Sequence, residues 1–319
     1  MSPDHTILAL LYDRADYVAL DELARAAGVD RPRLEAALST LHEGRWPLER
    51  TPDRGVRLVR PARPSVGLIE RGLGTRRVGR GVLCFDAVAS TNDVAWQAAE
   101  RNDADGLVVL AEYQRRGRGR LGRSWISPPG ANLLMSVVLC GGSLPPAEAL
   151  TVAAGLAVAE GIEAACGLRC SVKWPNDVHL DGRKCAGVLV EFRRSGTGGG
   201  LVVGIGVNVA AAPPDDTVHA PAACLNHAVG HAVERVELAR AVLRCLDAWV
   251  DHICKGRLEE LHTRWLARCE MMNQRVRVDT PGGQHVGRVV DVRPLEGLVL
   301  VCDDGRRVHI PAGGATLTR

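Results

Sequence analysis

Residues 171–192 read SVKWPNDVHLDGRKCAGVLVEF. Val178 to Leu180 and Ala186 to Phe192 are apolar runs of strand length, and the Asp181-Gly182 pair between them is typical of a hairpin turn. The polar motif Lys173-Trp174-Pro175-Asn176-Asp177 comes just before the first run. This stretch therefore predicts a β-hairpin that holds polar side chains in fixed directions at a strand end.

The sequence around the hairpin predicts one α+β domain. Further strands are predicted at Leu107 to Glu112, Leu133 to Cys140 and Leu201 to Val209. Helices are predicted at Leu150 to Cys166, which is rich in alanine, and at Glu237 to Ile253, where apolar residues recur at helical spacing. We expect this domain to span residues 83–271.

Residues 1–62 predict a winged helix-turn-helix. Helical patterns at Thr6 to Tyr12, Leu23 to Ala27 and Arg31 to His42 are followed by a segment that alternates as a two-stranded wing would. Gly28 is expected to end the second helix and Asp30 to cap the third.

The predicted DNA contacts are Glu22, Arg31 and Arg33, in a helix-turn-helix at about 21–41. The alternative is a three-helix unit that binds nothing. Residues 1–64 contain ten arginines and ten acidic residues, so this unit has no net positive charge to attract phosphates.

Two further segments complete the predicted organisation. Residues 63–82 contain Pro64 and several arginines, and they are expected to form a linker. Residues 272–319 contain short strands joined by tight turns, which predicts a small SH3-like β-barrel.

The composition excludes several classes of protein. With 319 residues, 46% hydrophobic and 24% charged, the chain is neither disordered nor a coiled coil. The longest uncharged stretch, Ser124 to Ala147, is broken by prolines and glycines, so we expect no membrane span there, and the first twelve residues do not resemble a signal peptide. The ten cysteines include no CxxC pair, which predicts reduced thiols in a cytoplasmic protein.

Lysine is rare in this chain. Only three of the 40 basic residues are lysines, Lys173, Lys184 and Lys255, and the remaining 37 are arginines. Two of the three lysines flank the hairpin motif, which favours a chemical role for them. A surface ion pair is the alternative for any one of them.

The segment Gly117 to Gly122 matches the dinucleotide pattern GxGxxG, but its context does not fit. No helix can follow through Pro128-Pro129, and no acidic residue lies between Tyr113 and Ala147. The loop instead carries arginines at 115, 116, 118, 120 and 123. Guanidinium groups pair with phosphate and carboxylate oxygens, so we expect this loop to fold around a polyanion.

Two other polar segments accompany strands. Ser90-Thr91-Asn92 precedes a predicted helix, where it could cap the helix or bind a small polar ligand. Gly204 to Asn208 ends an apolar strand, and its glycines permit close approach of a ligand to the backbone. No cluster of His, Cys and acidic residues has metal-site spacing, and no metal site is predicted.

These motifs, in this order, resemble the bacterial biotin–protein ligases, in particular the bifunctional ligase/repressors with an N-terminal winged helix-turn-helix. The resemblance covers nearly the whole chain and implies a mixed-sheet catalytic domain. It implies that biotin and MgATP give biotinyl-5′-adenylate, whose biotinyl group then passes to a lysine of the biotin carboxyl carrier protein of acetyl-CoA carboxylase. The same adenylate would act as corepressor at biotin operon DNA, with a homodimer forming when it is bound.

The resemblance also assigns site residues. Biotin would contact Ser90, Thr91, Asn92, Gln114, Gly117, Arg118, Gly119, Arg120, Lys184 and Gly187. The nucleotide would contact Arg123, Trp125, Lys173, Asn176 and Asn208. The implied catalytic residues are Arg118, Arg120, Lys184 and Asp177, with Lys184 holding the carboxylate and Asp177 steering or deprotonating the acceptor lysine.

The chain departs from some relatives in one respect that affects nucleotide binding. Residues 210–233 contain no aromatic side chain that could contact adenine. Three alternatives stay open: a ligase with a vestigial DNA-binding domain, a lipoate–protein ligase, and a biotin-sensing regulator without activity.

Overall fold

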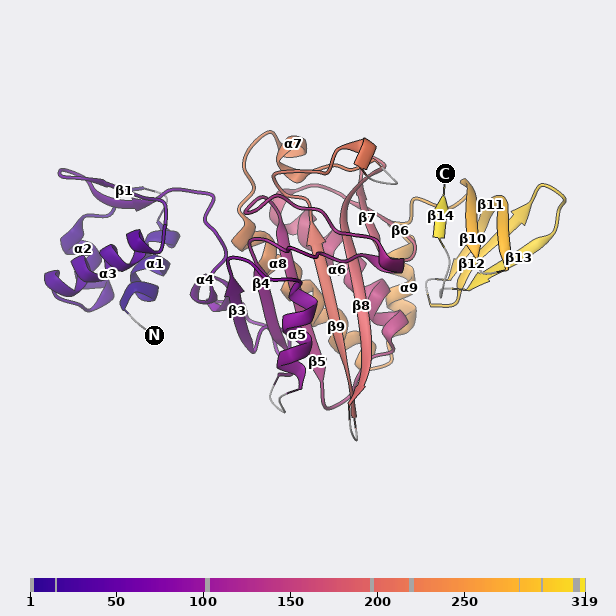
Figure 1. Ribbon diagram of the computed structural model, residues 1–319, viewed down its shortest axis with the longest axis horizontal. Helices are drawn as coiled ribbons and strands as arrows, with labels where there is room; N and C mark the ends of the chain where they lie inside the picture. The colour runs from indigo at the N-terminus through magenta and orange to yellow at the C-terminus, as the bar shows by residue number, and fades with distance from the viewer. Residues whose placement is uncertain are drawn as a thin grey trace.

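The computed structural model describes residues 3–14, 16–100, 104–195, 198–217, 221–280, 282–293, 295–311 and 316–318. Three bodies follow one another along the long axis of the molecule, with the largest in the middle (Figure 1). The N-terminal body and the C-terminal sheet lie at opposite ends of it.

A seven-stranded mixed sheet forms the middle body, in the order β3-β4-β5-β9-β8-β7-β6. Its strands are β3 (Gly81–Phe85), β4 (Leu107–Ala111), β5 (Leu133–Cys140), β6 (Ser171–Lys173), β7 (Asp177–Leu180), β8 (Arg183–Ser195) and β9 (Gly198–Val207). Only β3 and β4 pair in parallel, and the other neighbours are antiparallel. The predicted hairpin around Asp181-Gly182 is confirmed, with both turn residues at positive φ.

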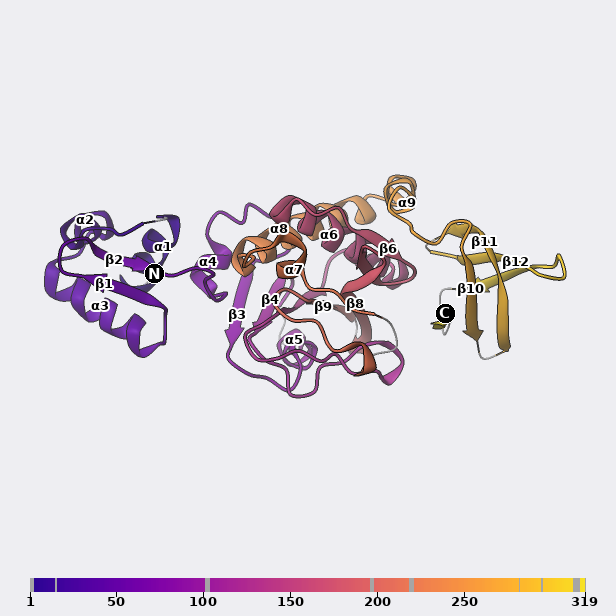
Figure 2. The same cartoon turned by 90° about the horizontal axis from the view of Figure 1, so that it is seen from above.

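The two faces of this sheet are covered differently. Val108, Val137 and Val203 belong to the main core, whereas the adjacent residues Val109, Val138 and Val202 pack in a second cluster with Trp96. This period of two places α6 (Ala147–Cys166) and α8 (Arg235–Cys254) on one face and α5 (Thr91–Ala99) on the other (Figure 2). Helices α7 (Leu225–Val229) and α9 (Leu258–Leu266) complete this body.

Helix α6 is long and apolar enough to cross a membrane by length and composition alone. It begins three residues earlier than predicted, directly after Pro146, and packs closely along α8. Most residues between Ala149 and Ile162, such as Ala153 and Val158, are buried. This is the core helix expected from its alanine-rich sequence, and its hydropathy reflects burial against the sheet.

The N-terminal body has the predicted helices and strands: α1 (Pro3–Asp13), α2 (Leu20–Ala27), α3 (Arg31–Glu43), β1 (Leu48–Thr51) and β2 (Gly55–Leu58). Gly28 ends α2 in the left-handed conformation, and the Asp30 side chain accepts a hydrogen bond from the Arg33 amide, as a cap should. A short helix, α4 (Val66–Glu70), interrupts the predicted linker.

Polar contacts attach the N-terminal body to α8. Tyr12 Oη donates to Glu237 Oε1 at 3.0 Å, and the Ala62 amide donates to the Glu234 carboxylate. The next residue, Arg235, reaches the other way, to Glu112 beside the strand that leads to the arginine loop. The first turn of α8 therefore contacts both the N-terminal body and the sheet.

The C-terminal body is a five-stranded antiparallel sheet in the order β13-β12-β11-β10-β14. Its strands are β10 (Arg275–Thr280), β11 (Gly283–Arg293), β12 (Gly297–Cys302), β13 (Arg307–Pro311) and β14 (Thr316–Thr318). The predicted strands are therefore present, and closure into an SH3-like barrel stays a prediction.

Candidate active site

A cavity of about 480 Å³ lies on the face of the sheet opposite α6, between the start of α5, the arginine loop and the β6–β7–β8 end of the sheet. It collects nearly every residue that the sequence predicted for biotin and nucleotide. Only Gly117 is not among its lining residues, because its Cα packs against the Trp125 backbone, where a Cβ would lie 2.4 Å from the carbonyl oxygen.

One corner of the cavity is lined by buried hydroxyl and amide groups. The Thr91 amide and Oγ1 lie 2.8 and 3.1 Å from Gln114 Oε1, and Ser136 Oγ lies 2.6 Å from Asn92 Oδ1. Ser90 occupies the N-cap position of α5 but makes no capping hydrogen bond with its side chain. Its hydroxyl therefore does not serve the helix in the way the capping alternative supposed.

The glycine at 204 gives this corner its shape. A Cβ there would lie 2.4 Å from Asn92 Oδ1, closer than real contacts allow. Any larger residue at position 204 of β9 would displace Asn92. Gly204 therefore permits the close packing of α5 on the sheet.

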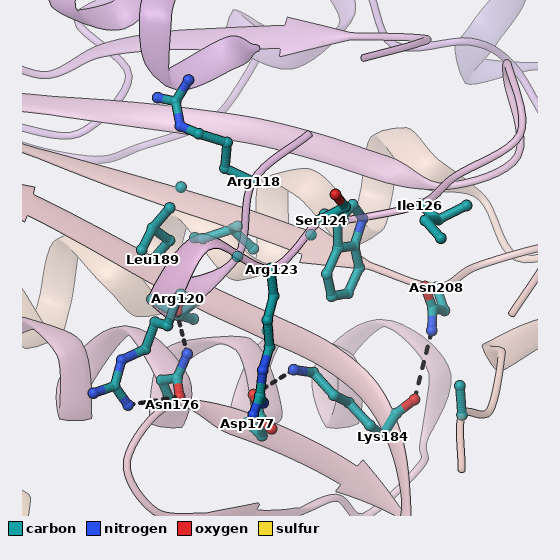
Figure 3. A pocket seen from close by; sticks show the side chains of 18 of the residues that line it. Arg118, Arg120, Arg123, Ser124, Ile126, Asn176, Asp177, Lys184, Leu189 and Asn208 are labelled. Atoms are coloured by element: carbon teal, nitrogen blue, oxygen red, sulfur yellow. Dashed lines mark hydrogen bonds and ion pairs between the residues drawn. The ribbon is translucent and has the colours of Figure 1, made fainter. Parts of the chain in front are cut away.

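The arginine loop divides into separate roles. Arg118 points away from the other labelled arginines (Figure 3), and its Nη1 lies 2.7 Å from Asp93 Oδ1 while Nη2 lies 3.5 Å from Glu191 Oε2. Asp93 and Glu191 therefore compensate the charge of Arg118, although the loop sequence itself contains no acidic residue. The compensating acids come from α5 and β8, which a search along the loop itself could not find.

The remaining loop arginines are not ion-paired among the described residues. Arg120 points to Asn176, with 3.3 Å between Nη1 and Oδ1 (Figure 3). Burial and the neighbouring charge of Arg123 lower the pKa of the Arg120 guanidinium, although Asp177 opposes this. Arg115 and Arg116 are exposed and do not line the cavity, so three of the five predicted arginines meet there.

Trp125 lies flat over two strands of the sheet. A Cβ at Gly206 would lie 2.5 Å from indole Cε2, and one at Gly187 would lie 3.2 Å from Cζ3. The indole Nε1 is buried without a hydrogen-bond partner among the described residues, and the ring lies 5.8 Å from Lys184 Nζ. The two glycines thus form the seat of an aromatic wall of the cavity.

The predicted lysine motif surrounds an ion pair. Lys184 Nζ lies 2.6 Å from Asp177 Oδ1, and each side chain is 28% exposed (Figure 3). Asn176 donates to the Val188 carbonyl, and Asn208 lies within 3.5 Å of the Lys184 carbonyl. Five of the described lining residues are basic, Arg118, Arg120, Arg123, Lys173 and Lys184, and only Asp177 is acidic, so the cavity suits a polyanion.

Comparison with known proteins agrees with this chemistry. Residues 84–208 match the Biotin/lipoate A/B protein ligase family. A biotin–[acetyl-CoA-carboxylase] ligase of Mycobacterium tuberculosis is 33% identical over 261 residues, which cover 78% of this chain and 92% of the relative. The chain belongs to the biotin–protein ligase family. It is a biotin ligase.

Two further similarities extend that assignment. The bifunctional ligase/repressor BirA of Bacillus subtilis is 28% identical, with 91% of each chain covered. The structure of the Aquifex aeolicus biotin protein ligase in complex with biotin and ATP matches with a TM-score of 0.66 at 27% identity, covering 75% of this chain and 99% of that one.

Sequence reasoning missed several lining residues of this biotin ligase. Leu121, Ile126 and Leu189 add apolar surface to the cavity, and Pro213, Thr217 and Ala222 approach it from the segment without aromatic residues. His179 is the missed residue with a titratable side chain. The alternation along β7 was its signal, because His179 lies two residues after Asp177 and so faces the same side of the sheet.

The predicted DNA contacts lie outside this site, on the N-terminal body. Arg31 is ion-paired with Asp21 and Glu35, both at 3.0 Å, and Glu22 lies 3.3 Å from Arg14. Arg33 is exposed at the start of α3. Arg31 and Glu22 are therefore already ion-paired within the protein, and Arg33 is not, among the described residues.

Proposed function

We propose that this biotin ligase joins biotin to AMP and then transfers the biotinyl group to a lysine of a biotin carboxyl carrier protein. One observation carries the proposal: a single cavity combines a neutral hydrogen-bonding corner at Ser90 to Asn92 with a cationic end at Lys184. The first suits a small polar head group, and the second suits the carboxylate and phosphates that must meet for adenylation.

Adenylation requires a carboxylate to attack the α-phosphate, and the two anions repel each other. Lys184 is proposed to hold the biotin carboxylate, exchanging its contact with Asp177 for the ligand. Arg120 and Arg123 would neutralise the phosphates, because neither is ion-paired within the described residues. The carboxylate oxygen would then bond to the α-phosphorus as pyrophosphate leaves.

Adenine would lie against the apolar part of the cavity. Trp125 offers a ring face there, and Asn176 and Asn208 line the same cavity. Because residues 210–233 provide no aromatic residue, we assign the stacking contact to Trp125.

Magnesium is proposed to arrive as MgATP. The described residues contain no group of three or more His, Cys, Asp or Glu that could hold a metal ion. Among the described lining residues Asp177 is the one carboxylate, and it already contacts Lys184, so no step here depends on protein ligands to the cation.

The experiment that tests this function separates the two half-reactions. Purified protein with labelled pyrophosphate and ATP should exchange label only when biotin is present, and a carrier domain added in trans should gain the mass of one biotinyl group. Lipoate in place of biotin tests the sister activity in the same ligase family. Exchange with lipoate but not with biotin would reject the proposal.

We also propose that residues 1–62 form a winged helix-turn-helix. In this proposal the protein forms a homodimer when the adenylate is bound, and the homodimer represses biotin genes. Two observations support this proposal. Residues 1–62 contain helices followed by a two-stranded sheet, in the order of a winged helix-turn-helix, and the chain matches a ligase/repressor over 91% of its length. A gel shift on the organism's biotin promoter tests it. No shift with biotin and ATP would leave a cytoplasmic ligase with a vestigial DNA-binding body.

A further inference from the structure

A second acid–base pair lies beside Lys184 on the cavity face of the sheet. Val178 and Leu180 of β7 belong to the core, so the alternate residues Asp177 and His179 face the cavity. His179 is paired in register with Lys184 on β8. The register of β7 and β8 shifts between Val178 and His179, and both His179 and Lys184 line the cavity, so the imidazole shares this face with the proposed carboxylate site.

Glu270 holds this imidazole from the other side. His179 Nδ1 lies 2.7 Å from Glu270 Oε1, and Ser171 Oγ donates to Oε2 at 2.6 Å. The Glu270 amide also bonds to the Val172 carbonyl, which fixes the carboxylate along the β6 edge. Serine, glutamate and histidine thus come from three segments that meet only in the fold.

The charge of Glu270 suits the task of orienting a histidine. Burial raises its pKa, but the hydrogen bonds from His179 and Ser171 and the positive charges of His179 and Lys173 outweigh burial, and the net pKa is lowered. Nδ1 has no other polar partner among the described residues, so the ionised Oε1 at 2.7 Å favours a proton on Nδ1 of the ring. In the neutral imidazole the lone pair is then on Nε2.

His179 is a buried lining residue of the cavity, and its side chain is 3% exposed. Among the residues that the structure describes, no side chain or backbone group is hydrogen-bonded to Nε2. The groups facing the ring are Glu270, Ser171 and Lys173 from the β6 edge, Asp177 on β7 and Lys184 on β8.

Transfer needs a base, and two titratable side chains of β7, Asp177 and His179, line the cavity. The acceptor lysine arrives as an ammonium ion and must lose a proton before its nitrogen can attack the acyl phosphate. Asp177 lies 2.6 Å from Lys184, whereas Nε2 of His179 has no hydrogen-bond partner among the described residues.

We propose that His179 is the base of the transfer step and that Glu270 is its positioning residue. Nε2 takes one proton from the acceptor ammonium, and the free amine attacks the biotinyl carbonyl carbon. The bond between that carbon and the phosphate oxygen then breaks, AMP leaves with the electron pair, and the second amine proton passes to solvent with the amide formed. This inference rests on the proposed transfer to a carrier lysine.

The test isolates the second half-reaction. Enzyme carrying preformed biotinyl-adenylate is mixed with the carrier domain and transfer is followed in a single turnover from pH 6 to 9. The variants are His179→Gln, His179→Asn and Glu270→Gln, with His309→Gln on the exposed face of the C-terminal sheet as a matched control. Hydroxylamine, which is already unprotonated near neutral pH, is the second acceptor.

We expect the His179 variants to transfer biotin to the carrier roughly 10²-fold more slowly at neutral pH, and Glu270→Gln to lose less. The pH profile of transfer to the carrier should differ between the wild-type enzyme and the His179 variants. Transfer to hydroxylamine should stay nearly normal, since that acceptor needs no base.

Two results would overturn the proposal. One is an unchanged rate and pH profile for the carrier in both His179 variants. The other is an equal loss with carrier and hydroxylamine, which a distorted site would give. Failure of the wild-type enzyme to modify the carrier at all would instead reject the proposed transfer function, and the base assignment with it.

Discussion

Lys184 and Asp177 are joined by a 2.6 Å ion pair at the centre of the cationic end of the cavity. Lys184 is the second residue of β8 and Asp177 is the first residue of β7. The Asp181-Gly182 hairpin between the two strands therefore sets the distance between their side chains. A ligand carboxylate that enters here meets an ammonium group already fixed in position, which lowers the cost of ordering it.

Replacing Lys184 with Ala should slow biotinyl-adenylate formation by about 10² to 10³. The ammonium is proposed to neutralise the attacking carboxylate. Lys255→Ala is the matched control, because Lys255 also pairs with an aspartate, Asp251, at 2.7 Å on the distant end of α8. Biotin-dependent pyrophosphate exchange measures both, and equal rates for the two variants would contradict the assignment.

Arg120→Gly should release the adenylate faster than the wild-type enzyme does. A charged hydrogen bond to the ligand contributes about 1.5 to 3 kcal/mol, so the dissociation rate should rise roughly 10- to 100-fold. Arg116→Gly removes an exposed arginine of the same loop that does not line the cavity. Trapping labelled adenylate after dilution distinguishes the two, and matching dissociation rates would mean that total loop charge alone retains the ligand.

The sequence predicted these motifs well because their geometry is local. The Asp181-Gly182 turn fixes the register of β7 and β8, and alternation then decides which side chains share a face. The partners of Arg118 were not predictable, because Asp93 and Glu191 lie 25 and 73 residues away along the chain. Such contacts depend on strand order, which periodicity in the sequence does not encode.

Gly206→Ala tests the seat of Trp125. A Cβ at 206 would lie 2.5 Å from the indole, so the ring must move off the sheet and narrow the cavity. We expect weaker ATP binding and a changed tryptophan fluorescence. Gly155→Ala in α6 is the control, because the added Cβ has open space around it. This variant should stabilise the helix by roughly 0.5 to 1 kcal/mol. Normal ATP affinity in Gly206→Ala would show that the ring does not form part of the nucleotide site.

Glu270→Gln should change how stability depends on pH. The pKa of Glu270 is lower in the folded protein than its ordinary value of 4.5, so the folded state favours the ionised form. Its contribution is fully present above the unfolded pKa and is lost as the pH falls through the folded pKa. The free energy of unfolding of wild type and variant should therefore converge between about pH 6 and pH 3. A constant difference in urea titrations across that range would refute the effect.

Tyr12→Phe should loosen the attachment of the N-terminal body to α8. The phenol donates to Glu237, which Arg240 also contacts, and burial with the nearby charges of Glu234 and Glu237 raises the pKa of Tyr12, so the hydroxyl keeps its proton. Losing this hydrogen bond costs about 1 kcal/mol, which predicts roughly fivefold faster hydrogen exchange at the ends of α1 and α8 that meet there. Tyr17→Phe removes a similar bond to Glu49, but an exposed one within the N-terminal body itself. Equal protection of α1 in the two variants would mean that apolar packing, rather than this polar contact, holds the bodies together.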